Sequence, residues 1–491
     1  MLKMVIKISR LPVLLLMILI SSLKSQATIP ADPLERLTYE INMFRTADTR
    51  VIPLMTPAFI INDSREFRMV IRSEIAYNSG AANLENMSDR WIGKGWSYFR
   101  SFNISRAGKY YAFSIEPFFF FNQNLDYIEP DRPRVYSKLI DNRTYDQSPL
   151  VKLNLRETQL FLHYRGLGGG VSNASMWWGA GLQSSLLMTN NTVQFPYLVL
   201  GTIHEQRIRK VGLNAQFFFS RLDDKNLGKP YFTALNLDAT YYSDPIVTVG
   251  LSRLFITPES IISWRSAIIQ PFQVFYRSKL STEENPSGWS PDDQMIIGFL
   301  RVVFPTANLT LFFELGRGDH AEDWVDLRRH PDHSVATIFG FRKVGLFDNE
   351  RLLFGFEYQN NVLPEKYWHL RYLGRESKIS FQDKESVDFN SYDGRHWAMH
   401  SGPDSDDMLI FAGYVADSWT LIPMINYERR GVIAAPLGIP EVKYELKLHF
   451  QYKFRDFLIN TLVEIERFDN YSFSERRVSN LVILVGIEKT L

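Results

Sequence analysis

The chain contains no cysteine among its 491 residues. This absence excludes disulfide bonds, thiolate metal sites and lipid attachment to an N-terminal cysteine. The chain also lacks an excess of charge of either sign, because its formal net charge is only +1. A nucleic-acid partner would require a basic face, so we expect no such partner.

Long apolar runs are scarce. Three basic residues precede an apolar run over Leu11–Ile20, and Ser25-Gln26-Ala27 matches a small-x-small cleavage site. We therefore expect residues 1–27 to be a signal peptide that is removed on export. No later stretch approaches the roughly 18 to 20 uncharged residues that a membrane-spanning helix needs. Any insertion into a membrane must then use strands.

Aromatic residues are plentiful instead, at 14% of the chain with 36 Phe and 23 Tyr. Such a surplus at nearly zero net charge is expected where rings lie at the two interfaces of a membrane. Export without cysteine fits the envelope of a Gram-negative bacterium. Soluble periplasmic proteins share that property, so the strand pattern must separate the two classes.

Alternation of apolar and polar residues is longest near the C-terminus. Lys443, Glu445 and Lys447 are among the polar residues that separate a set of six apolar ones. A side-chain period of two places the whole apolar set on one face of a strand. A soluble sandwich is the alternative, but ten or more residues suit a tilted transmembrane strand better. The apolar set is Tyr444, Leu446, Leu448, Phe450, Tyr452 and Phe454.

The same pattern recurs elsewhere and predicts a closed sheet. It continues over 457–465, directly after a tight turn at Arg455-Asp456, and returns over 211–219, 309–315 and 352–358. An open sheet edge in hydrocarbon would leave backbone groups unpaired, so the sheet must close. We predict an all-β fold, a transmembrane antiparallel β-barrel over residues 66–491, whose length allows about 16 to 18 strands. Charged residues on the inner face predict a wet lumen.

Loop lengths give the barrel an orientation, because bacterial barrels have short periplasmic turns and long extracellular loops. A periplasmic turn at 455–456 places the segments 430–442 and 469–478 outside. The turn at 416–418 and the C-terminus are then periplasmic. By the same reasoning the polar segment 375–407 is a surface loop.

Residues 28–65 differ in character from the barrel. Asp32 caps a helix that has Pro33 at its first position. This helix is too short for the barrel wall, so we expect a periplasmic or plug element at the barrel's mouth, with a loosely attached linker as the alternative. Four apolar residues lie on one face of the helix: Leu34, Leu37, Ile41 and Phe44.

The most distinctive segment runs from Trp177-Trp178-Gly179-Ala180-Gly181 to Asn190-Asn191 and Phe195-Pro196. It resembles the Wzi family of capsule assembly proteins, whose members carry a similar Trp-Trp-Gly-Pro-Gly stretch with later Ser-Leu and Asn-Asn positions. This chain has Ala180 where the family usually has Pro. Further similar segments are Leu213–Phe219, Phe312–Gly318, Tyr392–Trp397 and His400–Asp406.

The resemblance implies an 18-stranded barrel in the outer membrane, with N-terminal helices. It also implies a lectin that holds capsular polysaccharide at the cell surface. The expected partners are polysaccharide and outer-membrane lipids, and we expect a monomer without a cofactor.

Six residues are candidates for contact with sugar. Pyranose rings stack on aromatic faces, and their polar groups need charged or amide partners. Tyr392, Arg395, His396 and Trp397 combine these types on the expected surface loop, although exposed loops often mix such residues. Trp177 and Trp178 are further candidates, for which a bilayer-interface or tight-turn role is the alternative.

Metal and catalytic signals are weak. Asp404, Asp406 and Asp407 offer oxygen ligands for calcium, but a solvated acidic loop explains them better. His330 and His333 lack a third ligand. In the close pairs Asp319-His320 and Asp332-His333, the two adjacent side chains would point to opposite faces of a strand. No G-x-S-x-G motif occurs. We therefore predict no metal site and no catalytic residues, so a barrel enzyme ranks third. The main alternative to a polysaccharide anchor is a porin or oligosaccharide uptake channel.

Overall fold

The structure is a computed structural model, and it describes most of the chain after residue 27. The predicted signal peptide lies outside the described residues. The described residues are 28–29, 32–46, 53–56, 58–59, 67–83, 85–128, 148–223, 229–260, 262–272, 293–318, 328, 335–362, 391–393, 395–433, 435 and 438–491.

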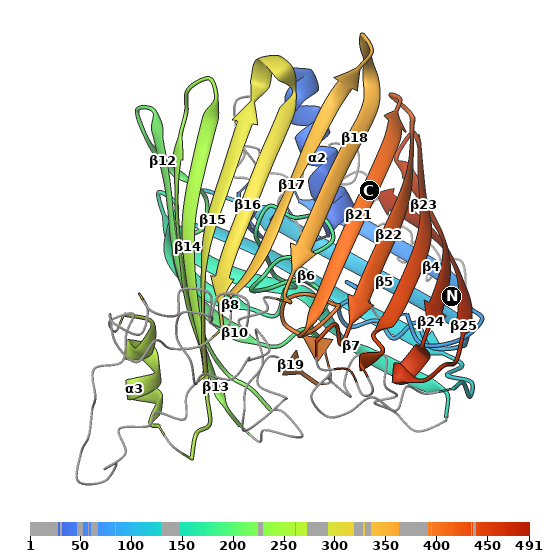
Figure 1. Cartoon of the computed structure of the whole chain (residues 1–491). Coiled ribbons are helices and arrows are strands. Elements are labelled where there is room, and N and C mark those ends of the chain that lie inside the picture. The colour runs from blue at the N-terminus through green and yellow to red at the C-terminus, as the bar shows by residue number, and fades with distance from the viewer. Residues whose placement is uncertain are drawn as a thin grey trace, which may run out of the picture.

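Within these residues, eighteen antiparallel strands close into a barrel (Figure 1). β25 pairs with β4 and so leaves no sheet edge. β10 and β11 both pair with β12 and form one interrupted strand. The predicted fold class and the strand count implied by the resemblance are therefore confirmed. The strands are β4 (Arg68–Asn78), β5 (Gly95–Ala107), β6 (Tyr111–Asn122), β7 (Leu150–Tyr164), β8 (Leu167–Ser172), β10 (Tyr197–Thr202), β11 (Gln206–Ile208), β12 (Val211–Arg221), β13 (Tyr231–Tyr241), β14 (Ile246–Thr257), β15 (Asp293–Phe304), β16 (Leu309–Arg317), β17 (Val335–Leu346), β18 (Asn349–Asn360), β21 (Ser405–Val415), β22 (Trp419–Arg430), β23 (Glu441–Phe454), β24 (Phe457–Asp469) and β25 (Val478–Thr490).

Short elements complete the structure. Three two-stranded pairs lie apart from the barrel sheet: β1 (Thr28–Ile29) with β3 (Ala58–Phe59), β2 (Met55–Thr56) with β9 (Trp177–Trp178), and β19 (Ser391–Tyr392) with β20 (Arg395–His396). The helices are α2 (Pro33–Thr46), α3 (Trp264–Ile269) and the 3-10 turns Gln270–Phe272, Pro305–Ala307 and Tyr471–Phe473. None of the helices in the described residues is long and apolar enough to cross a membrane.

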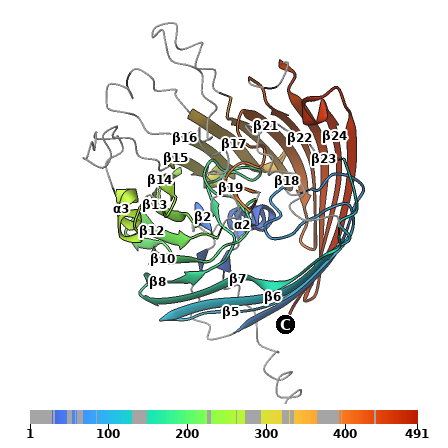
Figure 2. The same ribbon diagram turned by 90° about the horizontal axis from the view of Figure 1, so that it is seen from below.

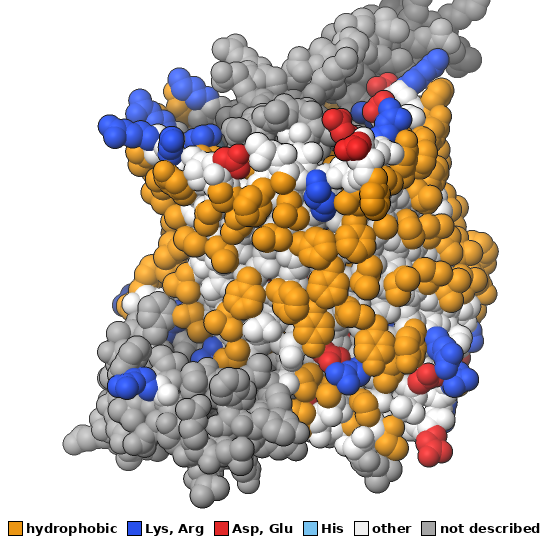
Figure 3. Space-filling view, turned by 45° about the horizontal axis from the view of Figure 1, so that its top comes forward, with side chains coloured by type: hydrophobic (Ala, Val, Ile, Leu, Met, Phe, Trp, Pro, Cys, Tyr) orange, Lys and Arg blue, Asp and Glu red, His pale blue; other side chains and the backbone are white. Residues whose placement is uncertain are grey.

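The barrel wall has an apolar outer face. On β23, Leu446 is 48% exposed, whereas its neighbour Glu445 is 3% exposed and points inward. Ile465, which lies opposite Leu446 on β24, is 51% exposed. Figure 3 shows a broad band of apolar side chains, with charged side chains gathered above and below it. This arrangement confirms the alternation and matches a wall that faces lipid.

The connections divide by length between the two ends of the barrel. Short turns of two to four residues, such as 416–418 and 455–456, lie at one end, which is the top in Figure 1. The connections 431–440 and 470–477 lie at the other end, as predicted. β4 begins and β25 finishes at the short-turn end, which is periplasmic in bacterial barrels.

The helix α2 packs inside the barrel. The side chain of Asp32 accepts hydrogen bonds from the backbone N–H groups of Leu34 and Glu35, both at 3.0 Å, and so caps the helix as predicted. Leu37 and Ile41 are buried against the inner faces of β18, β21 and β22. α2 therefore belongs to the filling of the lumen (Figure 2) and is not a loose linker.

The apolar band predicts the effect of a charge on the outer wall. We expect Leu446→Arg to lower the free energy of unfolding by about 2 to 4 kcal/mol, because a cation near mid-membrane is poorly solvated. Denaturant titration of the barrel in lipid vesicles measures this change. Leu446→Phe is the matched control and should stay within about 1.5 kcal/mol of the parent. Equal stability of the arginine variant would contradict the assignment of this face to lipid.

Candidate functional site

The lumen is filled by segments that return into the barrel from its long-loop end. We call these segments, together with α2, the plug: residues 79–83, 85–94, 173–196 and 395–404. Figure 2 shows α2, β2 and β19 inside the ring of strands. The plug shares one apolar core with inward residues of the wall, including Phe218, Phe232 and Phe312. The expectation of a wet lumen was therefore wrong over this part, because packed side chains occupy it.

The Trp-Trp-Gly segment forms the centre of the plug. Trp177 and Trp178 are 0% and 1% exposed, respectively. The ring of Trp178 lies 5.0 Å from that of Phe218 on the wall, and the Trp178 N–H donates to Met188 O at 2.9 Å. The Arg36 guanidinium lies over the Trp177 ring at 5.5 Å. Both tryptophans thus pack inside the barrel, not at a bilayer interface.

Two wall carboxylates hold the backbone of this segment. Glu357 on β18 accepts N–H groups from Leu182 at 2.6 Å, Gln183 at 3.2 Å and Ser184 at 2.8 Å. Glu314 on β16 accepts the Leu186 N–H at 3.0 Å. Irregular backbone inside a barrel needs such partners, because unpaired buried N–H groups are costly.

The departure from the family pattern at Ala180 has a structural consequence. The Ala180 N–H donates to Glu314 at 3.1 Å. Proline has no N–H and could not make this bond. The alanine therefore ties the turn to the wall by a hydrogen bond, where proline would restrict the backbone by its ring.

Arginines connect the same turn to α2. Arg36 on α2 donates to Gly179 O at 2.6 Å, and Arg342 on β17 donates to Ala180 O at 2.8 Å. Arg342 also forms an ion pair with Glu40 of α2 at 2.8 Å. Helix, plug and wall thus form one connected network. In this network arginines donate to backbone carbonyl groups, and carboxylates accept from backbone N–H groups.

Residues 391–393 and 395–404 lie inside the barrel, which corrects the expected surface loop. Arg395, His396 and Trp397 are 3%, 4% and 0% exposed. The Thr189 N–H donates to Trp397 O at 2.7 Å, and Arg395 donates to Ser88 O at 3.1 Å. Loop length gave the correct end of the barrel, but it could not show that the chain folds back into the lumen. Residues 375–390 of the expected loop lie outside the described residues.

Tyr392 is the exception among the six candidate residues. Its side chain is only partly buried, and its ring stacks on Trp397 with centroids 6.0 Å apart. The rings of Trp177, Trp178 and Trp397 have no exposed face in this structure. Contact of the six residues with sugar stays a prediction.

The acidic run at 404–407 is not solvated, which corrects a second expectation. Asp404, Asp406 and Asp407 are 1%, 6% and 3% exposed. Asp404 accepts the Ile433 N–H at 3.1 Å, and Asp406 forms an ion pair with Arg429. The histidines and aspartates of the other weak motifs, at 319–320 and 330–333, lie outside the described residues.

A buried charge network was not predicted. Lys443 contacts Glu85, Glu445 at 3.1 Å and Glu466 at 2.9 Å. Lys447 contacts Glu85 at 2.9 Å, Glu445 at 2.8 Å and Glu464 at 3.4 Å. The alternating lysines and glutamates of β23 placed these groups on the inner face, but nothing in the sequence pattern pointed to Glu85 on a distant connection.

His400 adjoins this network. Its Nε2 lies 3.4 Å from carboxylate oxygens of Asp407 and Glu428, and 3.9 Å from Glu85. Burial lowers the pKa of His400, but the carboxylates of Glu85, Glu428 and Asp407 outweigh burial and raise this pKa to about 9. Gln183 Nε2 lies 3.5 Å from the same ring nitrogen.

A cavity of about 240 Å³ lies beside the network. Its lining includes Asp32 and Glu35 at the start of α2, Glu488 near the short-turn end, and Glu85 and Lys447 of the charge network. The cavity therefore extends from the periplasmic side of α2 to the buried charges.

Comparisons with known proteins support the fold. Neither protein-family models nor curated proteins give a match. Among solved structures, the chain is similar to Wzi of Escherichia coli, described as a carbohydrate-binding β-barrel involved in group 1 capsule assembly. The TM-score is 0.56 at 10% identity, over 85% of this chain and 83% of that one. It is also similar to Acinetobacter baumannii OccAB4 (TM-score 0.41, 12% identity, 87% and 98% covered) and Pseudomonas aeruginosa OccK7 (0.43, 11%, 87% and 99%).

The carboxylate of Glu357 gives a prediction for plug stability. Glu357→Gln removes the charge that accepts three N–H groups, so we expect the free energy of unfolding to fall by about 2 to 3 kcal/mol. Guanidinium titration followed by tryptophan emission reads both the transition and the exposure of the buried indoles. Glu350→Gln is the control, because Glu350 is exposed at the short-turn end of the same strand. Equal losses in both variants would argue against the described bonds.

Proposed function

We propose that this chain is an outer-membrane protein that binds capsular or other extracellular polysaccharide and holds it at the cell surface. It would reach the membrane through the signal peptide of residues 1–27 and act as a monomer without a cofactor or catalytic activity. The resemblance of the Trp-Trp-Gly segment to the Wzi family supports this proposal. So does the similarity of the fold to the carbohydrate-binding barrel of Escherichia coli.

The single observation that carries the proposal is the packed plug. Trp177, Trp178 and Trp397 lie in the lumen, and Glu314 and Glu357 accept hydrogen bonds from the backbone of the plug. A diffusion channel needs a continuous wet path, whereas an anchor needs a fixed outer surface. Packing between the three lumen segments fixes the base of the outer loops, so polysaccharide would meet a preorganised surface.

The six candidate residues divide into two roles under this proposal. Tyr392 keeps part of its ring accessible and is the residue that would stack on a sugar face. Arg395, His396 and Trp397 would hold the backbone on which Tyr392 lies. Trp177 and Trp178 would support that segment from inside the barrel.

Deletion of the gene tests the proposal. We expect polysaccharide to move from the cell-bound fraction to the medium, while the total amount made stays unchanged. Wild-type complementation should restore the cell-bound fraction, and Tyr392→Ala should restore less of it. Tyr110→Ala is the matched control, because Tyr110 is exposed at the short-turn end of the barrel. An unchanged cell-bound fraction in the deletion strain would refute the proposal.

The second candidate is a porin or oligosaccharide uptake channel, which the cavity of about 240 Å³ favours. Planar-bilayer recordings distinguish the two functions. We expect low conductance from the wild-type barrel and higher conductance from a Glu314→Gln/Glu357→Gln double variant, because its plug is less firmly held. A large, steady conductance from the wild-type protein would favour the channel and contradict the anchor.

A further inference from the structure

The network around Glu85 contains more buried carboxyl groups than basic groups. Within the described residues, its cationic partners are Arg430, Lys443, Lys447 and, when protonated, His400. Seven carboxylates oppose these four groups. The carboxylates are Glu85, Asp407, Glu428, Glu441, Glu445, Glu464 and Glu466. Each is less than a tenth exposed, so water solvates these groups poorly.

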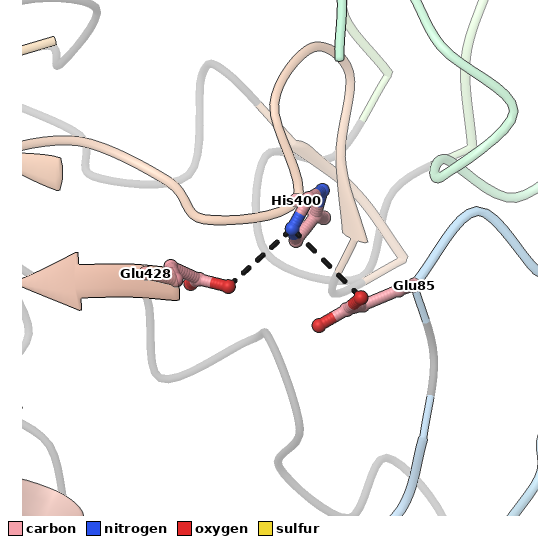
Figure 4. A group of neighbouring side chains, drawn as sticks. All are labelled: Glu85, His400 and Glu428. Atoms are coloured by element: carbon pink, nitrogen blue, oxygen red, sulfur yellow. Dashed lines mark ion pairs between the residues drawn. The ribbon is translucent and has the colours of Figure 1, made fainter. Parts of the chain in front are cut away.

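Three of these carboxylates converge on one nitrogen. His400 Nε2 lies 3.4 Å from Glu428 Oε2, 3.4 Å from Asp407 Oδ2 and 3.9 Å from Glu85 Oε2 (Figure 4 shows Glu85 and Glu428). A well-formed N–H···O bond spans about 2.7 to 3.2 Å, so none of the three separations is one. The contributing atoms of Glu85, His400 and Glu428 all lie within 4.8 Å of one another.

Two of the three oxygens that face His400 have no hydrogen-bond partner, and the third, Glu85 Oε2, accepts from Lys447 at 2.9 Å. Glu428 uses Oε1 for Arg430, and Asp407 uses Oδ1 for Asn426. Their second oxygens, Glu428 Oε2 and Asp407 Oδ2, are buried and have no hydrogen-bond partner among the described residues. Buried carboxylate oxygens are costly when unpaired. Two such atoms aimed at one imidazole nitrogen require a positive charge there, which either a proton on Nε2 or a metal ion bound to it supplies.

The spacing fits a metal ion. Ligand atoms about 2.1 Å from a tetrahedral zinc ion lie about 3.4 Å from one another. The distance from His400 Nε2 to Glu428 Oε2 equals that value, and the distance to Glu85 Oε2 is 3.9 Å. One imidazole nitrogen with carboxylate oxygens is a donor set for zinc or manganese, and the absence of cysteine excludes thiolate ligation.

We propose that Glu85, His400 and Glu428 bind one divalent transition-metal ion, with zinc as the best-fitting metal. The ion would bring positive charge to this group of buried carboxylates. It would also join the connections that carry Glu85 and His400 to the wall strand β22, and so hold these connections in place. Glu85 lines the cavity, which gives the ion a route from the periplasmic side.

A neighbouring carboxylate group provides a contrast. Glu85, Glu445 and Glu464 also bring their oxygens within 4.8 Å of one another. Lys447 lies among all three, at 2.9, 2.8 and 3.4 Å. Lys447 contacts all three carboxylates of that group but only Glu85 in the His400 group, so we assign the metal to the His400 side.

Metal analysis of the full-length barrel, purified in detergent, tests the proposal. After chelator treatment, we expect the wild-type protein to take up about one equivalent of Zn²⁺ when titrated with zinc chloride. His400→Gln and Glu428→Gln should weaken binding by more than roughly 100-fold, which exceeds the loss typical of an outer partner. Glu466→Gln is the matched control, because Glu466 contacts Lys443 in the same network but is not among the three carboxylates that face His400.

Cobalt substitution of the wild-type protein keeps the proposal testable if the variants do not fold. Co²⁺ bound by nitrogen and oxygen ligands should give visible absorption bands that zinc removes on exchange. The proposal is overturned if the wild-type barrel takes up neither metal, which would mean a protonated imidazole paired with carboxylates only. Stoichiometric binding that survives both ligand substitutions would overturn it equally. These outcomes are independent of polysaccharide binding.

Discussion

The structure depends on one constraint: every buried backbone N–H and C=O group must find a partner, both in the membrane and inside the barrel. The wall meets this constraint by closing β25 onto β4. The plug has no regular sheet to close, so side chains of the wall pair with its buried backbone groups. Glu357 alone accepts N–H groups from three consecutive residues, Leu182 to Ser184.

This solution couples the wall to the plug. Inward residues of a wide barrel normally face water, but here Glu314, Glu357 and Arg342 face irregular backbone. The helix α2 joins the same network through Arg36 and Glu40. The plug is therefore part of the folded barrel and does not behave as a separate insert. Because this packing fixes the outer surface of the barrel, we favour binding of polysaccharide over diffusion through a channel.

Sequence reasoning succeeded where the information is local. Leu446 and Glu445 are neighbours on one strand, and a period of two assigns them to opposite faces without any knowledge of the rest of the chain. Asp32 caps α2 within three residues, and the tight turn at Arg455 and Asp456 fixes which loops share an end. It failed for residues whose environment comes from distant segments. Trp397 and Asp404 stand in a polar stretch that is typical of a surface loop, yet both are buried, because Trp397 packs on Phe232 and Asp404 accepts the Ile433 N–H.

The sequence by itself therefore determined the apolar outer face, the order of turns and loops, and the cap of α2, because each follows from spacing of a few residues. Only the tertiary structure decided what fills the lumen. Glu85 and Lys443 are 358 residues apart in the chain and in contact inside the barrel, and no periodicity relates them. Closure of the barrel brings such pairs together, since the curvature of the whole wall sets which inward side chains meet the returning loops.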